Sequence, residues 1–348
     1  MVDSLTLTRP DDWHLHFRDG DALRTTVPAT AKDFGRAVVM PNLRPPISGV
    51  DAARAYRGRI LECLEPGSSF EPLMTLYLTD RTSPLDIRKA ADEDWLVACK
   101  LYPAGATTNS DHGVTSMARI SDVLSTMEEV GMPLLVHGEA TDAEIDIFDR
   151  EQVFIERELK PLLERFPRLR VVFEHITTLQ AAEFVEGARD GVAATITPQH
   201  LLMNRNDLLV GGLKPHNYCL PVLKRQNHQV ALQRAATSGN PRFFLGTDSA
   251  PHGRADKEND CGCAGCYCAP AALSLYAEFF DGAGELERLE GFAAHFGADF
   301  YGRTRNPQHV TLYREPWTVP ERVDYVGADG IVPFWAGREL NWKVRETE

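Results

Sequence analysis

The motif His14-Leu15-His16 closes a short apolar segment near the start of the chain. Side chains of a β-strand alternate between two faces, so histidines at positions 14 and 16 would point to the same side. A strand can offer two ligands to one metal ion in this way. The pair alone is weak evidence, so the metal-site interpretation depends on further ligands at the ends of other strands.

Further ligand-type residues do follow or end short apolar segments, and they are Asn42, Lys100, His137, His175 and Asp248. Nitrogen and oxygen ligands of this kind suit zinc. Each residue has a more ordinary interpretation. A strand-end histidine is more often structural, Asp248 could cap a helix, and Lys100 could extend its ammonium to solvent. Taken together, these ordinary interpretations are weak, because five separate strand ends would have to carry ligand-type residues by chance.

Lys100 is the unusual member of this set, because an ammonium has no lone pair and cannot bind a cation. A lysine loses its proton more readily when it is buried near positive charge. The neutral amine could react with carbon dioxide to give a carbamate, an anionic group able to bridge two metals. We therefore predict a two-metal site that holds and acidifies a bridging water, with negative charge from the carbamate and Asp248.

The elements that must position these residues alternate regularly. Nearly continuous apolar segments, typical of parallel strands buried on both faces, predict strands at 13–16, 37–40, 73–78, 96–101, 134–137, 171–175, 192–197 and 243–247. Helical patterns between them predict helices at 50–64, 84–94, 115–130, 142–164, 179–187 and 223–237. This alternation predicts a (β/α)8 barrel of the TIM type, whose active site lies at the carboxyl ends of the strands.

The length of 348 residues suits one such barrel, and no repeat or linker marks a second domain. We therefore expect residues 1–348 to form a single domain. The segment 306–348 is rich in Pro, Gly and Trp, and we expect it to pack over the barrel as an irregular addition that could pair with residues 4–8.

The net charge of −13 argues against a nucleic-acid partner, which would require a basic surface. No apolar segment approaches the roughly 20 residues needed to span a bilayer, so we expect no membrane partner. The first residues lack the features of a signal peptide, and we therefore expect a cytoplasmic protein. In an acidic protein, an anionic substrate would need local cations or metal to bind.

The candidate ligands lie in longer motifs, namely DWHLHFRDG at 12–20, MPNL at 40–43, KLYPAGATTNS at 100–110 and TDSAPH at 247–252. Together they resemble the dihydroorotase family of the binuclear amidohydrolase superfamily, in its form without a fused multifunctional partner. The resemblance runs over essentially the whole chain. It implies an enzyme that interconverts N-carbamoyl-L-aspartate and L-dihydroorotate in de novo pyrimidine synthesis, and it implies a homodimer.

The resemblance also implies a role for each metal-site residue. Two zinc ions per chain would be bound, the more buried one by His14, His16 and Asp248 and the second by His137 and His175. Lys100, as its carbamate, would bridge the two ions. Asp248 would in addition be the catalytic residue that accepts and returns a proton.

A further set of residues would contact the substrate, and its members are Arg18, Asn42, Thr107, Thr108, His137, Leu220, His252 and Ala264. Arg18, Asn42 and His252 would hold the α-carboxylate, for which Arg18 offers a planar pair of donors. Thr107 and Thr108 lie in the segment matching the family's mobile loop, a lid that could exclude water. The backbone at Leu220 and Ala264 would contact the ring amide. An ion pair of Arg18 with Asp19 or Asp21 is the ordinary alternative.

Four of the seven cysteines crowd into the segment 261–268, at positions 261, 263, 266 and 268. Such a cluster could bind a structural zinc ion or an iron–sulfur centre. In the family that the chain resembles, a similar stretch is an active-site loop without a metal of its own. Cys219 is predicted to be a buried thiol near the site.

Two other functions are compatible with the fold. A hydantoinase would have an apolar pocket for a ring substituent and no carboxylate clamp, which the set Arg18, Asn42 and His252 argues against. A non-catalytic metal-binding relative would lack a metal ligand or Asp248, and none is missing from this chain.

Overall fold

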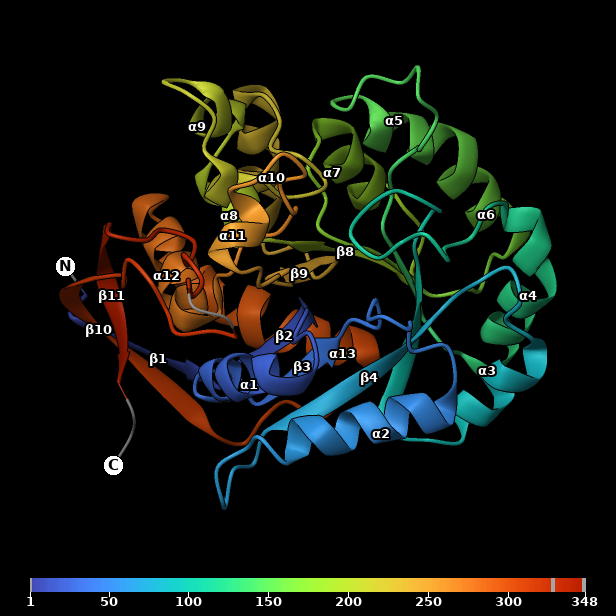
Figure 1. Ribbon diagram of the computed structural model, residues 1–348, viewed down its shortest axis with the longest axis horizontal. Helices are drawn as coiled ribbons and strands as arrows, with labels where there is room; N and C mark the ends of the chain where they lie inside the picture. Colours follow the sequence, from blue (N-terminus) through green and yellow to red (C-terminus); the bar gives the residue numbers. More distant parts are fainter. Residues whose placement is uncertain (1, 327–328, 346–348) are drawn as a thin grey trace.

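The computed structural model describes residues 2–326 and 329–345, and in this part of the chain eight parallel strands curl into a barrel surrounded by helices (Figure 1). The strands follow one another around the sheet in chain order. They are β2 (Asp11–Leu15), β3 (Arg36–Val39), β4 (Glu71–Tyr77), β5 (Leu96–Leu101), β6 (Leu134–Val136), β7 (Val171–Phe173), β8 (Val192–Ile196) and β9 (Phe243–Leu245). The predicted barrel and each predicted strand are confirmed, with ends that differ by a few residues.

The barrel closes between β2 and the end of β9 through backbone hydrogen bonds at the predicted ligands. The Asp248 N–H donates to the carbonyl oxygen of His14 over 2.8 Å, and the His16 N–H donates to the carbonyl oxygen of Ser249 over 2.9 Å. The first and last strands therefore meet where both carry ligand-type side chains.

The interior of the barrel beneath this closure is filled by apolar side chains. Trp13 stacks on Tyr301, with ring centroids 4.5 Å apart, and packs edge-on against Phe244. A Cβ on Gly297 would lie only 2.0 Å from the indole nitrogen of Trp13, so glycine is required for this close approach. This packed interior places the space for a ligand at the carboxyl end of the strands.

Helices cover the outside of the barrel (Figure 1). The predicted ones are confirmed as α2 (Val50–Leu61), α3 (Pro84–Ala91), η2 (Met117–Ile120) with α4 (Ser121–Val130), α7 (Leu179–Glu186) and α10 (Gln226–Thr237). The helix predicted at 142–164 begins only at Arg150, as α5 (Arg150–Phe154), η3 (Ile155–Leu159) and α6 (Lys160–Arg165). Before it, the Asp146 carboxylate accepts the Phe148 N–H over 2.8 Å and holds a turn instead of a helix.

Several helices have no counterpart in the predictions: α1 (Leu23–Ala31), α8 (Pro198–Leu202), α9 (Arg205–Leu209), α11 (Arg254–Lys257), α12 (Ala272–Gly282), α13 (Phe296–Tyr301), and the short η1 (Gly20–Ala22), η4 (Pro215–Asn217), η5 (Ala269–Ala271), η6 (Leu286–Arg288) and η7 (Gly291–His295). Helix α1 contains Pro28 and three threonines, which are poor helix formers. Helix α12 is buried on most sides, so it lacks the polar face that marks an amphipathic helix.

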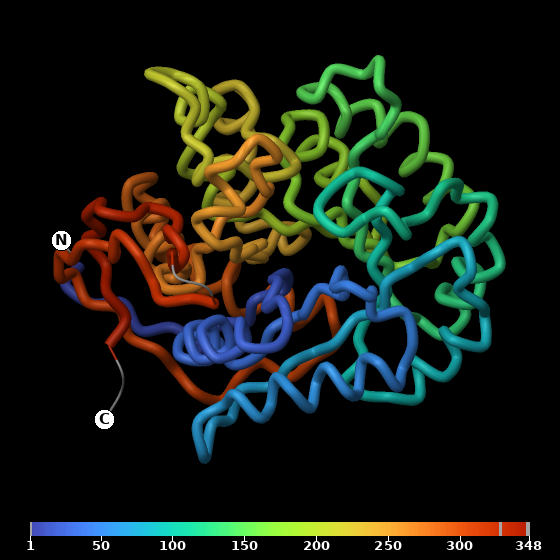
Figure 2. Tube along the Cα trace, viewed as in Figure 1, coloured from blue at the N-terminus to red at the C-terminus, as the bar shows by residue number. Residues whose placement is uncertain are grey.

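The prediction that segment 306–348 is irregular is wrong, because it contains two strands. Its predicted pairing with residues 4–8 is confirmed. Strands β1 (Ser4–Thr8), β10 (His309–Thr318) and β11 (Glu339–Arg345) form an antiparallel sheet in the order β1-β10-β11. Figure 2 shows the blue N-terminal strand beside the red C-terminal segment at one edge of the molecule. Leu340 and Trp342 of β11 are fully buried, and the residue between them is not. This alternation along the strand is typical of a sheet with one face against the core.

Of the helices in the described part of the chain, none combines the length and apolar character needed to cross a membrane.

Candidate metal centre and active site

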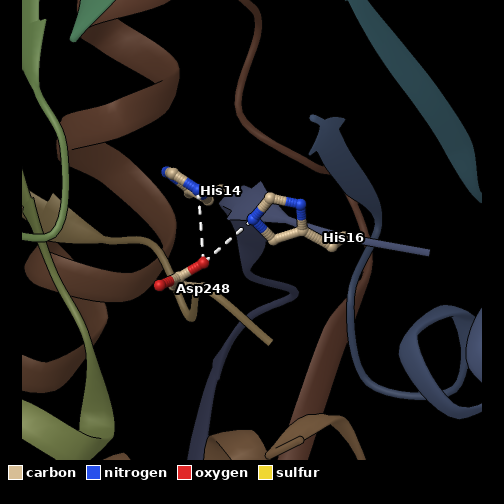
Figure 3. Close-up of side chains that lie close together, drawn as sticks. All are labelled: His14, His16 and Asp248. Atoms are coloured by element: carbon tan, nitrogen blue, oxygen red, sulfur yellow. Dashed lines mark hydrogen bonds and ion pairs between the residues drawn. The ribbon is translucent and has the colours of Figure 1, made fainter. Parts of the chain in front are cut away.

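Three of the predicted ligands meet where the barrel closes. Figure 3 shows the Asp248 carboxylate directed at the imidazoles of His14 and His16. One carboxylate oxygen, Oδ1, lies 3.1 Å from His16 Nε2 and 3.4 Å from His14 Nε2. One ligand atom from each residue lies within 4.8 Å of the other two. Two imidazole nitrogens and a carboxylate are a donor set that suits a divalent metal such as zinc.

The other two predicted histidine ligands form a second pair beside the first. His137 Nδ1 and His175 Nε2 lie 3.2 Å apart. The His175 ring also lies beside that of His14, with 5.0 Å between the ring centroids. The structure thus brings the four histidines of strands β2, β6 and β7 together, as the two-metal prediction requires.

Carboxylate and amide groups hold the ring nitrogens that face away from the cluster. Glu174 Oε2 lies 2.8 Å from His14 Nδ1, Glu139 Oε2 lies 2.9 Å from His137 Nε2, and Asn42 Oδ1 lies 2.8 Å from His16 Nδ1. Such partners orient a histidine and set which ring nitrogen is available to a metal.

The sequence predictions missed Glu139 and Glu174. Both are fully buried, which is rare for a carboxylate without a specific partner. The sequence did contain a signal for both, namely an acidic residue in or next to an apolar strand segment. Glu174 directly precedes His175, and Glu139 follows His137 by two residues.

Lys100 lies at the same end of the barrel with its side chain fully buried. Within the described part of the chain its Nζ has no hydrogen-bond partner, and neither has the buried His14 Nε2. Burial lowers the pKa of the Lys100 ammonium to about 8, and the charges of Glu174 and Asp248 oppose this shift only in part. Buried polar atoms are rarely left unpaired, so these two atoms fit a site that is completed by metal and a modified lysine.

The Asp248 carboxylate is held in its ionised form. Burial alone would raise its pKa, but the hydrogen bond with His16 and the charges of His14 and His16 lower it to about 2. A carboxylate that stays ionised can bind a metal and can accept a proton during a reaction.

Backbone strain is concentrated in this region. Arg18, His175 and Asp248 have φ angles of 64°, 41° and 47°, in the left-handed region that residues other than glycine rarely adopt. Each follows the end of a barrel strand and turns its side chain toward the site. Strain of this kind persists only where the surrounding structure enforces it, and it is frequent at active sites.

Most of the predicted substrate contacts line one small pocket above the ligands. Its lining from the predicted set is His14, His16, Arg18, Asn42, Thr107, Thr108, His137, His175, Leu220, Asp248 and Ala264. The lining also contains Tyr102, Ala250 and Gly265, which were not predicted. Lys100 and His252 do not line it; Lys100 is fully buried, and His252 Nε2 contacts Arg18 Nη2.

Arg18 takes part in neither of the surface ion pairs considered as its alternative, because Asp19 pairs with Arg59 and Asp21 with Arg24. Its Nε donates to the carbonyl oxygen of Pro251 over 3.0 Å, and its Nη2 lies 2.8 Å from His252 Nε2.

The predicted lid segment contacts the pocket through Asn42. Asn42 Nδ2 donates to the carbonyl oxygen of Thr108 over 3.0 Å, and Asn109 Nδ2 donates to the carbonyl oxygen of Asn42 over 2.9 Å. Because Asn42 Oδ1 is also bonded to His16, one side chain links this segment to a candidate ligand.

The cysteine cluster does not gather its sulfur atoms around one point. Cys266 Sγ lies 3.6 Å from the carbonyl oxygen of His216, Cys268 Sγ lies 3.7 Å from that of Thr247, and Cys261 is exposed. Within the described residues, the three-ligand group that could hold a metal contains no cysteine. The structure therefore does not support a zinc or iron–sulfur centre in this segment. Cys219 is buried, as predicted.

Comparison with known proteins decides among the cyclic-amide hydrolases. The model of the amidohydrolase family matches residues 11–303. A dihydroorotase from Idiomarina loihiensis is 62% identical to this chain over 344 residues, which is 99% of this chain and 100% of the relative. The chain belongs to the dihydroorotase family.

Solved structures agree with this membership. A dihydroorotase from Campylobacter jejuni has a TM-score of 0.90 at 35% identity, and the match covers 99% of both chains. A dihydroorotase from Saccharomyces cerevisiae, solved with 5-fluoroorotic acid, has a TM-score of 0.91 at 32% identity with the same coverage. The chain is therefore a cyclic amide hydrolase, and membership in the dihydroorotase family implies a metal cofactor and a small-molecule substrate.

Proposed function

We propose that this chain catalyses the zinc-dependent, reversible cyclisation of N-carbamoyl-L-aspartate to L-dihydroorotate and water, the third step of de novo pyrimidine synthesis. The observation that carries this proposal is the position of Arg18 in the same small pocket as His14, His16 and Asp248. An arginine fork beside a metal site suits a substrate that carries a carboxylate as well as the amide that reacts. We also propose that residues 1–348 act as one domain and that the chain forms a homodimer, as its family resemblance implies.

The metal site would hold two zinc ions. His14, His16 and Asp248 would bind the first, and His137 and His175 the second. When bound, the ions would polarise the ring carbonyl and supply an activated water at neutral pH.

Lys100 would bridge the two ions as its carbamate. Its side chain is fully buried, and among the described residues its Nζ has no hydrogen-bond partner, an unfavourable position for an ammonium. Conversion to a carbamate would exchange a buried cation for an anion beside two divalent cations.

Asp248 would act as base and then as acid. Its carboxylate would take a proton from the attacking water and return it to the ring nitrogen as the amide bond opens. In the biosynthetic direction the carbamoyl nitrogen would attack the side-chain carboxyl carbon, and a water molecule would leave. Because this closure is intramolecular, correct positioning removes much of its entropic barrier.

Positioning would fall to the other pocket residues. Arg18 and His252, already in contact, would bind the α-carboxylate. Asn42 uses both ends of its amide, on His16 and on Thr108, so it would exchange one partner to reach the substrate. The backbone at Leu220 and Ala264 would bind the ring amide, with Thr107 and Thr108 closing the pocket.

The direct test is hydrolysis of L-dihydroorotate by zinc-loaded protein, followed by the appearance of N-carbamoyl-L-aspartate, together with metal analysis. We expect turnover and about two zinc ions per chain. A folded, zinc-loaded protein that opens a substituted hydantoin but not dihydroorotate would refute the proposal.

A further inference from the structure

Lys257, at the end of α11, is a buried cation that the proposed mechanism does not use. Its side chain is about 3% exposed. Its Nζ donates to backbone carbonyl oxygens of Tyr218, Cys263 and Gly265, over 3.0, 3.0 and 2.5 Å. All three ammonium donors are thus directed at main-chain carbonyls, and among the described residues no carboxylate forms an ion pair with it.

The carbonyls that Lys257 binds flank the two pocket segments that would contact the ring. Tyr218 lies two residues before Leu220, while Cys263 and Gly265 lie on either side of Ala264. The Gly265 N–H also donates to the carbonyl oxygen of Tyr218 over 3.0 Å, so the two segments are joined directly as well.

The segment around Gly265 has little freedom to shift by itself. A Cβ at Gly265 would lie 2.7 Å from the carbonyl oxygen of Ala250 and 2.9 Å from His252 Cδ2. Ala250 and Leu220 line the pocket, and His252 contacts Arg18. A change in the spacing that Lys257 sets would therefore move the wall that faces the ring.

We propose that Lys257 is a positioning residue that sets the separation of the Leu220 and Ala264 backbones and so determines recognition of the amide edge of the substrate ring. This inference rests on the proposed function, because it assumes a cyclic amide in the pocket. Replacing buried ion pairs by apolar side chains of similar volume is often neutral or stabilising, so burial of a charge is weak evidence for a stabilising role. A lysine bonded only to carbonyls is therefore better explained by the geometry it imposes than by stability.

The test uses zinc-loaded full-length protein and compares Lys257→Met, Lys257→Arg and wild type. Lys257→Met keeps all but the terminal atom of the side-chain length and removes the donors, whereas Lys257→Arg keeps charge and donors. The control is Arg36→Met, which removes another buried cation, bonded to Asp11 at the opposite end of the barrel. For each variant, kcat and KM for L-dihydroorotate, the Kd of orotate, zinc content and Tm are measured.

For Lys257→Met we expect KM and the orotate Kd to rise about tenfold, the effect of roughly one lost hydrogen bond to a ligand, with zinc content unchanged. Lys257→Arg should recover part of this loss. Arg36→Met should lower Tm and leave both constants unchanged. If Lys257→Met does not fold, Lys257→Gln, which keeps two donors, is measured in its place with the same expected direction.

A lower Tm with KM and orotate Kd within twofold of wild type, in either the Met or the Gln variant, would overturn the inference and leave Lys257 a structural residue. The proposed function is tested separately, by the activity of the wild type. A wild type that does not hydrolyse dihydroorotate refutes that function, whereas an active wild type with unaffected Lys257 variants refutes only the role of Lys257.

Discussion

Replacement of Glu174 by glutamine tests whether the charge of a buried carboxylate strengthens His14 as a metal ligand. Glu174 Oε2 accepts a hydrogen bond from Thr195 Oγ1 over 2.6 Å and lies 2.8 Å from His14 Nδ1. With the proton on Nδ1, His14 presents a lone pair at Nε2, which faces Asp248 over 3.4 Å. The carboxylate thus selects the tautomer that can bind metal.

In Glu174→Gln the amide oxygen can take the position of Oε2 and accept from both Thr195 and His14, while the NH2 group takes the position of Oε1, which has no hydrogen-bond partner among the described residues. The variant therefore loses the negative charge that makes His14 Nε2 a stronger ligand for a metal. Loss of such a partner weakens metal binding by about 10- to 100-fold, or roughly 1.4 to 2.8 kcal/mol. We therefore expect zinc affinity to fall by that factor.

The assay is zinc competition with a chelator of known affinity, followed by dihydroorotate hydrolysis over a range of zinc concentrations. Activity of Glu174→Gln should recover in part as zinc is raised. The matched control is Glu151→Gln, because Glu151 is equally buried but bonds Thr177 and Thr178 instead of a histidine. Unchanged zinc affinity in Glu174→Gln, or the same loss in Glu151→Gln, would refute this reasoning.

Three further predictions concern the lysine, the carboxylate anchor and the packing beneath the site. Lys100→Ala should lose activity, and added short carboxylic acids should restore part of it; full activity without them would exclude the carbamate. Arg18→Met should lower kcat/KM for dihydroorotate about 100-fold, since roughly 3 kcal/mol of charge-assisted binding is lost, and an unchanged value would remove the clamp role. Gly246→Ala would place a Cβ 2.7 Å from the Thr195 side chain and 3.1 Å from His14 Cβ, so chemical denaturation should show a loss of about 1–3 kcal/mol and metal analysis less bound zinc.

Much of the barrel could be predicted because its strands have a local signature. Segments such as Leu96–Leu101 are apolar throughout, as expected of strands covered on both faces, and each was recognised without knowledge of its neighbours. Helix α12 and the strands β10 and β11 were missed for the opposite reason, although the pairing of the segment 306–348 with residues 4–8 was predicted. Their burial depends on partners that are distant in the sequence, and Ser4–Thr8 pairs with a strand some 300 residues away.

The sequence by itself determined which chemical groups are available and, through the strand periodicity, that His14, His16, Lys100, His137, His175 and Asp248 would share one end of a barrel. The parallel direction of the strands is sufficient for that prediction, since the carboxyl ends of parallel strands lie at the same edge.

Only the tertiary structure decided how these groups are arranged. Closure of the barrel through the bond between Asp248 and His14 sets the contacts among the first three ligands. The pairing of Glu174 with His14 and of Lys257 with the carbonyl oxygen of Tyr218 depends on chain segments far apart in sequence, and no local pattern encodes such contacts. The physical reason is that periodicity reports the face on which a side chain lies, whereas the choice of its partner depends on how the whole barrel packs.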